Sequence, residues 1–421
     1  MSNITSNKIF GFTLLFILCF AVFIMRRPDI IQNPQFWAED GAVWYEQINH
    51  IGSIQSILLP RNGYFQTISK LTASLASYFP LYLAPIFFNI TALILRCCVV
   101  MYLLSSRMSI YSFWCRAVVA CFILLMPNLE EVHANITNTH WYLSMWLFMI
   151  LISKNTNGLY WKAHDYFVLA LSGLSGPFIV LMLPILMLKQ IQNIKGSTSD
   201  RLIKKLWPMI DVFSVSFVLI SLIQIFSILL SADSTRSHAP LGWSLQILCN
   251  ILSSHIFIGF LLPMKQALYT WDFYFFNIII SISSLAMTLY VFCKGDWRSK
   301  SIVLFPALML FFALIKPMIH ETHTQWPMIQ YGAGQRYFLI PSVFWCAIIM
   351  MASYLFSRKA LLLTSLLMIF AILITGYSNF RISALPDSKW LEQASKFEGL
   401  QPGEVMKFDI TPPGWSMNLI R

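Results

Sequence analysis

The sequence predicts an all-α polytopic membrane protein with roughly 9–11 transmembrane helices, and three observations lead to this prediction. Of the 421 residues, 57% are hydrophobic and only 11% are charged, whereas about 25% of the residues of a soluble domain are charged. Long apolar runs recur along the whole chain. Basic residues gather in short segments between these runs, as the positive-inside rule describes for cytoplasmic loops. The net charge of +11 therefore indicates a lipid bilayer as the partner, not nucleic acid.

The apolar runs define the expected spans. They cover residues 9–25, 81–104, 117–126, 140–152, 209–230, 273–293, 302–315, 338–356 and 360–377. A full crossing needs about 20 residues, so the helices of the shorter runs must include flanking residues. We expect residues 1–377 to form one transmembrane bundle. Residues 378–421 have a soluble composition and are expected to form a short periplasmic tail over the outward loops, with Trp390 and Trp415 as anchors.

One apolar stretch is interrupted and predicts a broken or re-entrant helix. Basic segments on both sides, at residues 154–165 and 189–205, are assigned to the cytoplasm. The run between them must then enter and leave on the same face. It contains Gly173, Gly176 and Pro177, and broken helices are tolerated in membranes where protein supplies the missing hydrogen bonds. The alternative is a single kinked span with one loop wrongly assigned.

With the N-terminus inside, the outward loops are residues 26–80, 127–139, 231–272 and 316–337. Arg26 and Arg27 conflict with this orientation, because they would lie outside, directly after the first helix.

The first outward loop contains two adjacent acids, Glu39 and Asp40, beside Trp37. A carboxylate among aromatic side chains at a membrane interface is desolvated, which raises its pKa. Such a group can deprotonate a sugar hydroxyl within hydrogen-bond reach, and Asp40 is slightly favoured as the base. The alternative is that both acids are simply solvated in a loop.

The second outward loop is also rich in polar residues. Glu130, Glu131, His133, Asn138, His140 and Trp141 lie within twelve residues between two apolar runs. Together they suit a pocket that binds sugar hydroxyls, and Trp37 would join it. A divalent cation, Mg²⁺ or Mn²⁺, is a less favoured occupant, because its oxygen ligands would have to come from separate loops. Each histidine taken alone is more typical of a structural residue.

Arg336 and Tyr337 lie at the end of the last outward loop, after Gly332 and Gly334. An arginine at this position either snorkels to the interface or binds a lipid phosphate in a bidentate way. Arg61 is a second candidate for phosphate binding.

Four short motifs give the chain a resemblance to a known class. They are Phe-Trp-Ala-Glu-Asp-Gly at 36–41 after the first helix, the polar loop ending in His-Trp at 140–141, Gly-Gln-Arg-Tyr-Phe at 334–338, and Pro-Pro-Gly-Trp-Ser-Met at 412–417. In order and spacing they resemble the GT-C class of membrane glycosyltransferases. The closest resemblance is to the serotype-converting O-antigen glucosyltransferases encoded by temperate phages.

The resemblance implies a bacterial inner-membrane enzyme whose active site faces the periplasm. It implies undecaprenyl phosphate-glucose as the sugar donor and a lipid-linked O-antigen or other surface polysaccharide as the acceptor. Two other functions stay open. A flippase or transporter would place its ionisable residues near the bilayer midplane, whereas here they gather in the outward loops. An O-antigen polymerase or ligase would share the compartment and the lipid substrates.

Overall fold

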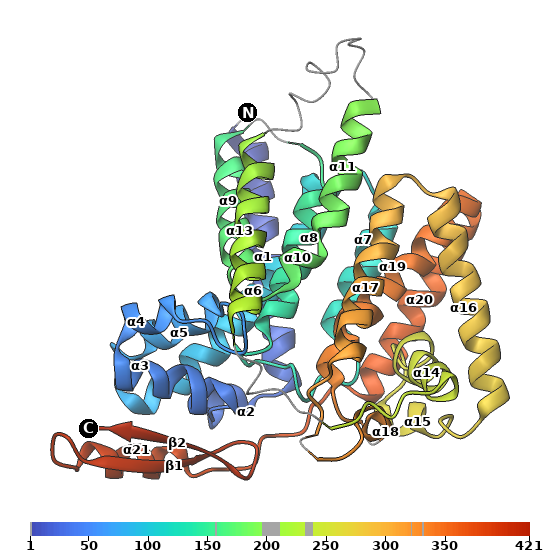
Figure 1. Cartoon of the computed structure of the whole chain (residues 1–421). Coiled ribbons are helices and arrows are strands. Elements are labelled where there is room, and N and C mark those ends of the chain that lie inside the picture. Colours follow the sequence, from blue (N-terminus) through green and yellow to red (C-terminus); the bar gives the residue numbers. More distant parts are fainter. Residues whose placement is uncertain (1, 156–157, 196–210, 232–238, 321, 331) are drawn as a thin grey trace.

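The computed structural model describes residues 2–155, 158–195, 211–231, 239–320, 322–330 and 332–421. Within this part of the chain, seven helices are long and apolar enough to cross a membrane, or up to eight if one bent pair counts as a span. The only described sheet has two strands. These findings confirm the predicted all-α polytopic class (Figure 1).

The long helices coincide with the apolar runs of the sequence. They are α1 (Ser2–Arg26), α6 (Ala84–Leu104), α13 (Val212–Leu230), α16 (Tyr274–Lys294), α17 (Trp297–Ile315), α19 (Leu339–Phe356) and α20 (Arg358–Ser378). Two shorter apolar helices, α7 (Phe113–Leu125) and α8 (Thr139–Ile152), pack among them. Because α8 is buried along its whole length, it is surrounded by protein and not by lipid.

The bundle has two ends with different contents (Figure 1). The end that we call the basic end, uppermost in the figure, carries the short connections between α6 and α7, α16 and α17, and α19 and α20. The opposite end, which we call the loop end, carries the four segments predicted to face outward and the C-terminal tail. Arg201, Lys204 and Lys205 of the predicted basic linkers lie outside the described residues.

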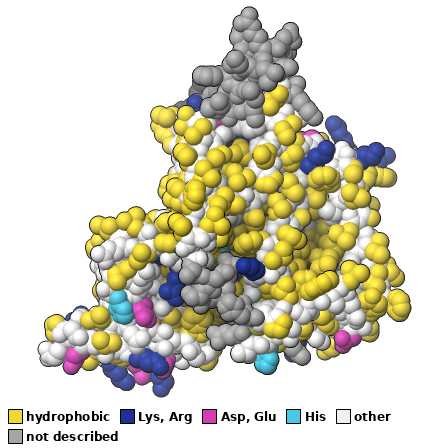
Figure 2. All heavy atoms as spheres, viewed as in Figure 1, with side chains coloured by type: hydrophobic (Ala, Val, Ile, Leu, Met, Phe, Trp, Pro, Cys, Tyr) yellow, Lys and Arg dark blue, Asp and Glu magenta, His cyan; other side chains and the backbone are white. Residues whose placement is uncertain are grey.

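The surface between the two ends is apolar. Figure 2 shows hydrophobic side chains across the middle of one face, with most charged side chains near the ends. On α16, Phe275 and Ile279 are largely exposed. Exposing apolar side chains on many helices is unfavourable in water, but such a surface is suited to contact with lipid chains.

The predicted break near Gly173 is present. Helix α9 (Leu159–Gly173) ends there, and α10 (Phe178–Leu181) and α11 (Leu183–Lys195) turn back, with a bend of 113°. The Nε2 of Gln224 in α13 donates to the carbonyl oxygens of Gly173 and Gly176, at 2.7 and 3.2 Å. The backbone N–H of Thr67 donates to Leu174. Because neighbouring segments supply hydrogen-bond partners for the interrupted backbone, such a break is tolerated inside a membrane bundle.

The loop end is built from short helices. The first segment forms α2 (Asp29–Gln32), the π-helix η1 (Asp40–Tyr45), α3 (Glu46–Ile51), α4 (Ser53–Leu58), α5 (Thr67–Ala76) and the 3₁₀-helix η2 (Leu81–Leu83). Later segments form α14 (Leu245–Ile251), the π-helix η5 (Leu252–Phe257), α15 (Met264–Leu268), α18 (Gln325–Ile329) and the 3₁₀-helix η6 (Gln335–Phe338). One further 3₁₀-helix, η3 (Ser106–Met108), lies at the basic end.

The tail packs against the first loop segment. It comprises α21 (Trp390–Glu398) and the antiparallel strands β1 (Val405–Ile410) and β2 (Trp415–Ile420), with Val405 opposite Ile420. Trp390 is fully buried, with its ring 5.0 Å from that of Phe36. Of the two expected anchors only Trp390 is buried; Trp415, the first residue of β2, remains 38% exposed.

Arg26 and Arg27 are buried, which explains their unexpected place in the sequence. The guanidinium of Arg26 donates to the carbonyl oxygens of Leu124, Met126 and Phe380. Arg27 donates to Ser383 and Glu130. The carbonyls at the C-terminal end of α7 have no partners within the helix, and a cation there also complements the helix dipole. Arg26 thus joins the end of α1 to α7 and the tail, and Arg27 joins the second loop to the tail.

Candidate functional site

The motif at 36–41 adopts an unusual backbone at the loop end. Ala38 has φ of +40°, a left-handed conformation that is unfavourable for a residue with a Cβ atom. Glu39 then caps the π-helix η1, whose first residue is Asp40. Left-handed non-glycine residues and π-helical turns both occur preferentially at functional sites. The local geometry therefore marks the two acids as a candidate site.

The C-terminal tail holds this motif in place. The N–H of Ala38 donates to the carbonyl of Thr411, and the N–H of Thr411 donates to that of Phe36 at 3.1 Å. A Cβ atom on Gly41 would lie only 2.9 Å from Cδ1 of Ile410. Glycine at this position is what lets the first strand of the tail approach the motif. The tail is thus part of the scaffold of the site.

Asp40 is almost completely buried and is bound to the second loop. One carboxylate oxygen accepts from the N–H of Ile136 at 3.0 Å, and the other accepts from the N–H and the hydroxyl of Thr137 at 2.9 and 2.6 Å. The hydroxyl of Thr137 in turn accepts from Nε1 of Trp44. Burial raises the pKa of Asp40 to about 7, although these hydrogen bonds act in the opposite direction. Both oxygens are used to fix the second loop to the first.

Glu39 is only half-buried, and the charges of neighbouring side chains act on its carboxyl group. Burial raises the pKa of the Glu39 carboxyl, and the nearby charges of Arg336 and Arg61 partly oppose this rise, while Glu131 adds to it. These four residues come from three separate loop segments. We call Glu39, Arg61, Glu131 and Arg336 the acid–arginine cluster.

Arg336 is the most constrained member of this cluster. Its guanidinium pairs with the Glu131 carboxylate, whose second oxygen accepts from the backbone N–H of Arg336 at 3.1 Å. Its Nη2 donates to the carbonyl of Met318 at 2.6 Å and to the hydroxyl of Tyr337 at 3.2 Å. The side chain of Arg336 nevertheless keeps 28% of its surface exposed. It is therefore oriented by protein and still reachable by an anionic ligand.

His140 and Trp141 lie beside the cluster, where α8 begins. Nδ1 of His140 contacts the carbonyl oxygen of Thr137, and the charge of Arg336 acts on the ring. A Cβ atom on Gly176, at the break between α9 and α10, would lie 3.4 Å from His140. Trp141 packs between Phe178 and Tyr337, at 4.6 and 6.1 Å between ring centroids. The broken helix thus contributes to one wall of the site.

Three predicted pocket residues have other surroundings. His133 is buried with one ring nitrogen 3.0 Å from Arg96 and the other 3.1 Å from the carbonyl of Phe23, and burial together with Arg96 lowers its pKa. Glu130 is exposed near Arg26 and Arg27. Asn138 donates to Glu131 and Asn135 within its own loop. The contacts of His133 and Asn138 stabilise the second loop.

The remaining predicted residues frame the cluster. Trp37 is half-buried and its backbone bridges to Thr411 of the tail. Tyr337 is buried, and its hydroxyl accepts from the N–H of Met318 at 2.8 Å. Arg61 is exposed in a tight turn closed by Tyr64. Among the described residues, no group of three or more His, Cys, Asp or Glu side chains could hold a metal ion.

No protein-family model matches the sequence, and no curated protein does. Solved structures of the Archaeoglobus fulgidus oligosaccharyltransferase are similar to this chain: a complex with Zn and sulfate has a TM-score of 0.48, and the apo form has 0.49, both at 12% identity over 92% of this chain. A form tethered to an acceptor peptide has a TM-score of 0.45 at 10% identity over 93%. The chain spans 55 to 59% of the length of these structures. Similarity at this level assigns no activity, so the function has to be inferred from the site itself.

Sequence reasoning missed three residues that build the site. Thr137 binds Asp40, and Phe178 packs against His140 and Trp141. Gln224 donates a hydrogen bond to the backbone carbonyl of Gly173 at the helix break. Gln224 was the most detectable of them, because a lone amide inside the apolar run of α13 needs a polar partner in the membrane.

Proposed function

We propose that the protein is a glycosyltransferase that moves a sugar, glucose in the simplest case, from a polyprenyl phosphate to a lipid-linked O-antigen or related surface polysaccharide. The observation that carries this proposal is the acid–arginine cluster. It combines a half-buried carboxyl of raised pKa with an oriented, partly exposed arginine, on the loop end of a membrane bundle. A sugar transfer from a lipid phosphate needs a base for the acceptor hydroxyl and a cation for the departing phosphate.

We assign the base to Glu39. Sequence reasoning slightly favoured Asp40, but both oxygens of Asp40 accept hydrogen bonds from the second loop. Glu39 is less buried and faces the charges of Arg336 and Arg61. A carboxylate with a raised pKa is a stronger base while it is still ionised near neutral pH. Asp40 is then a positioning residue that joins the first loop to the second.

Arg336 is assigned to the donor phosphate. In the proposed step the acceptor oxygen attacks the anomeric carbon, and the bond from that carbon to the phosphate oxygen breaks. The electron pair of this bond leaves with the phosphate, and the hydroxyl proton passes to Glu39. The guanidinium of Arg336 stabilises the negative charge of the departing phosphate. Arg61 is a second contact for this phosphate, and His140, Trp141 and Trp37 are assigned to the sugar pocket.

The direct test is a transfer assay with the purified protein in lipid nanodiscs. The donor is polyprenyl phosphate with radiolabelled glucose, and the acceptor is a lipid-linked O-antigen repeat. We expect label to move to the acceptor, and none to move from UDP-glucose. Movement of unmodified lipid-linked saccharide across vesicles, without any transfer in the nanodisc assay, would instead identify a flippase. Growth of the acceptor by whole repeats would identify a polymerase.

The proposal also requires the loop end to face the periplasm of a bacterial inner membrane. Two exposed positions at opposite ends test this, Gln401 at the loop end and Ala163 at the basic end. In a chain without the eight native cysteines, an impermeant thiol reagent applied to intact spheroplasts should label Gln401→Cys and leave Ala163→Cys unlabelled. The reverse pattern contradicts the proposed orientation and the mechanism that depends on it.

A further inference from the structure

A cavity opens near the basic end of the bundle, whereas the acid–arginine cluster lies at the loop end. It lies between α6, α7, α8, α17 and α19 and contains about 620 Å³ of empty space, including its open mouth. Only about 80 Å³ of this space is wide enough for the centre of a water molecule, so the cavity is narrow. Apart from Tyr111 and Arg116, its lining side chains are aliphatic, sulfur-containing or phenylalanine, and five of them are methionines. Methionine adapts its shape easily, so such a wall suits a flexible hydrocarbon chain.

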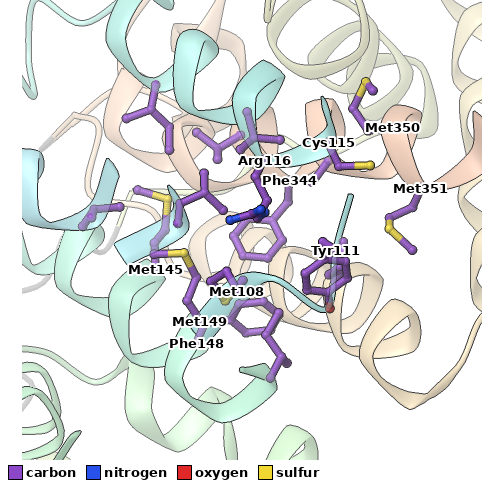
Figure 3. Close-up of a pocket in the computed structure, with 18 residues that line it drawn as sticks. Met108, Tyr111, Cys115, Arg116, Met145, Phe148, Met149, Phe344, Met350 and Met351 are labelled. Carbon is purple, nitrogen blue, oxygen red and sulfur yellow. The ribbon is translucent and has the colours of Figure 1, made fainter. Parts of the chain in front are cut away.

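Arg116 enters this apolar space without a carboxylate partner. Figure 3 shows its side chain ending beside Phe344 in the middle of the cavity. Its Nη1 donates to the carbonyl oxygens of Leu104 and Ser105, both at 3.1 Å, where α6 ends. Its Nε is buried and has no hydrogen-bond partner. None of the ion pairs among the described residues includes Arg116, so its charge is compensated only by the carbonyls of a helix end.

Tyr111 provides a second unpaired polar group in the same cavity. Its hydroxyl is buried and makes no hydrogen bond. Asp296 and Arg298, whose charges act on this hydroxyl, pair with each other at 3.8 Å. A buried N–H or O–H group without a partner is unfavourable by about 1–3 kcal/mol in proteins generally, so such groups indicate a missing acceptor.

We propose that this cavity binds an anionic membrane phospholipid. One acyl chain lies along the methionine-rich wall, and the phosphate diester accepts hydrogen bonds from Nε of Arg116 and the hydroxyl of Tyr111. A wholly apolar occupant would leave both donors unpaired, and a zwitterionic lipid would bring a second cation beside Arg116. The basic end, which also carries the exposed Arg358 and Lys359, favours an anionic headgroup electrostatically. This inference depends on the membrane fold and not on the proposed transfer reaction.

The test uses the full-length protein in nanodiscs that contain a trace of phosphatidylglycerol with a photoreactive diazirine in its acyl chain. Phosphatidylcholine with the same chain is the matched neutral probe. Peptides from α7, α8 and α19 are then examined for lipid adducts. We expect about fivefold more phosphatidylglycerol than phosphatidylcholine on the cavity peptides, the ratio expected from one basic side chain near an anionic headgroup. Equal labelling by both probes would overturn the proposal.

Variants separate the headgroup contact from the chain contact. Arg116→Gln should remove the preference for phosphatidylglycerol, and the milder Tyr111→Phe should reduce it, so the headgroup claim stays testable if Arg116→Gln folds poorly. Ala347→Trp, which fills the cavity from α19, should lower labelling by both probes. Arg381→Gln at the loop end and Leu363→Trp on the exposed surface of α20 should change neither result.

Two outcomes would contradict the assignment. Labelling that persists in Ala347→Trp comes from lipid around the protein, not from the cavity. Displacement of the probe by polyprenyl phosphate at a lower mole fraction than by unlabelled phosphatidylglycerol would make the carrier lipid the occupant.

Discussion

The two ends of the bundle use polar side chains in different ways. At the basic end several act over one helical turn. Asp211, Asp296 and Ser357 each accept a hydrogen bond from the residue three positions later and start a helix. Longer contacts occur there too: Arg107 pairs with Asp165 at 2.8 Å, and Arg298 donates to the carbonyl of Ile152.

At the loop end, polar side chains join segments that are distant in sequence. Asp40 binds residues 136–137, Glu131 binds Arg336, and Arg26 binds residues 124–126 and 380. Local caps are each worth about 1 kcal/mol, and they fix where helices begin. Long-range buried contacts fix where loops meet, and a site that needs groups from three loops can form only at such an end.

The largest expected effect is at Glu39. Glu39→Gln should reduce sugar transfer by about 10²–10⁴-fold, because the amide keeps the shape but cannot accept the hydroxyl proton. Membrane insertion and thermal stability should change little, since the carboxylate accepts a hydrogen bond only from the backbone of Glu39 itself among the described contacts. Initial rates in the nanodisc assay measure this, with the exposed Glu392→Gln on α21 as control. Near wild-type transfer by Glu39→Gln would remove Glu39 from the mechanism.

The next effect concerns the shape of the cation. Arg336→Lys keeps the charge, but a lysine cannot contact Glu131, Met318 and Tyr337 together while offering a planar fork to phosphate. Transfer efficiency should fall about 10- to 100-fold, the equivalent of one charge-assisted hydrogen bond. Arg381→Lys, an exposed arginine at the same end that donates to the carbonyl of Met25, is the control. If both variants transfer sugar normally, Arg336 only anchors its loop.

A stability comparison sharpens the contrast between the ends. Thr137→Val removes the hydroxyl that joins Asp40 to Trp44 and should destabilise the protein by about 1–3 kcal/mol. Ser357→Ala, which removes a local cap at the basic end, should cost about 1 kcal/mol or less. Only the first change should also lower sugar transfer. Denaturation in mild detergent, followed by the transfer assay, measures both, and equal effects on activity would contradict the difference between the ends.

The last prediction concerns the pH dependence of stability. Burial raises the pKa of Asp40 from 3.8 to about 7, so between these values the folded protein holds a proton that the unfolded chain has released. The stability contributed by this group is therefore complete below about pH 4 and is lost as the pH rises to about 7. Thermal unfolding from pH 4 to 8 should show this decline, and it should be shallower in Asp40→Asn. An unchanged slope in Asp40→Asn would mean that other groups cause it.

The sequence by itself determined the membrane class, the positions of the helices and the break at Gly173, because each follows from local apolarity or from glycine and proline within a few residues. It also placed Glu39, Arg61, Glu131 and Arg336 in segments expected on one side of the bilayer. The physical reason is that hydropathy and backbone conformation are properties of short stretches of chain.

Only the tertiary structure decided what each polar residue contacts. It showed that Arg26 and Arg27, which conflicted with the expected topology, are buried and bind the end of α7 and the second loop, respectively. It also showed that His133 contacts Arg96, whereas His140 lies where the charge of Arg336 acts on it. It also distinguished the two neighbouring acids: Asp40 is fixed to Thr137, whereas Glu39 faces the arginines. Adjacent residues have nearly the same sequence context, but the direction of each side chain depends on segments a hundred or more positions away, which no local pattern records.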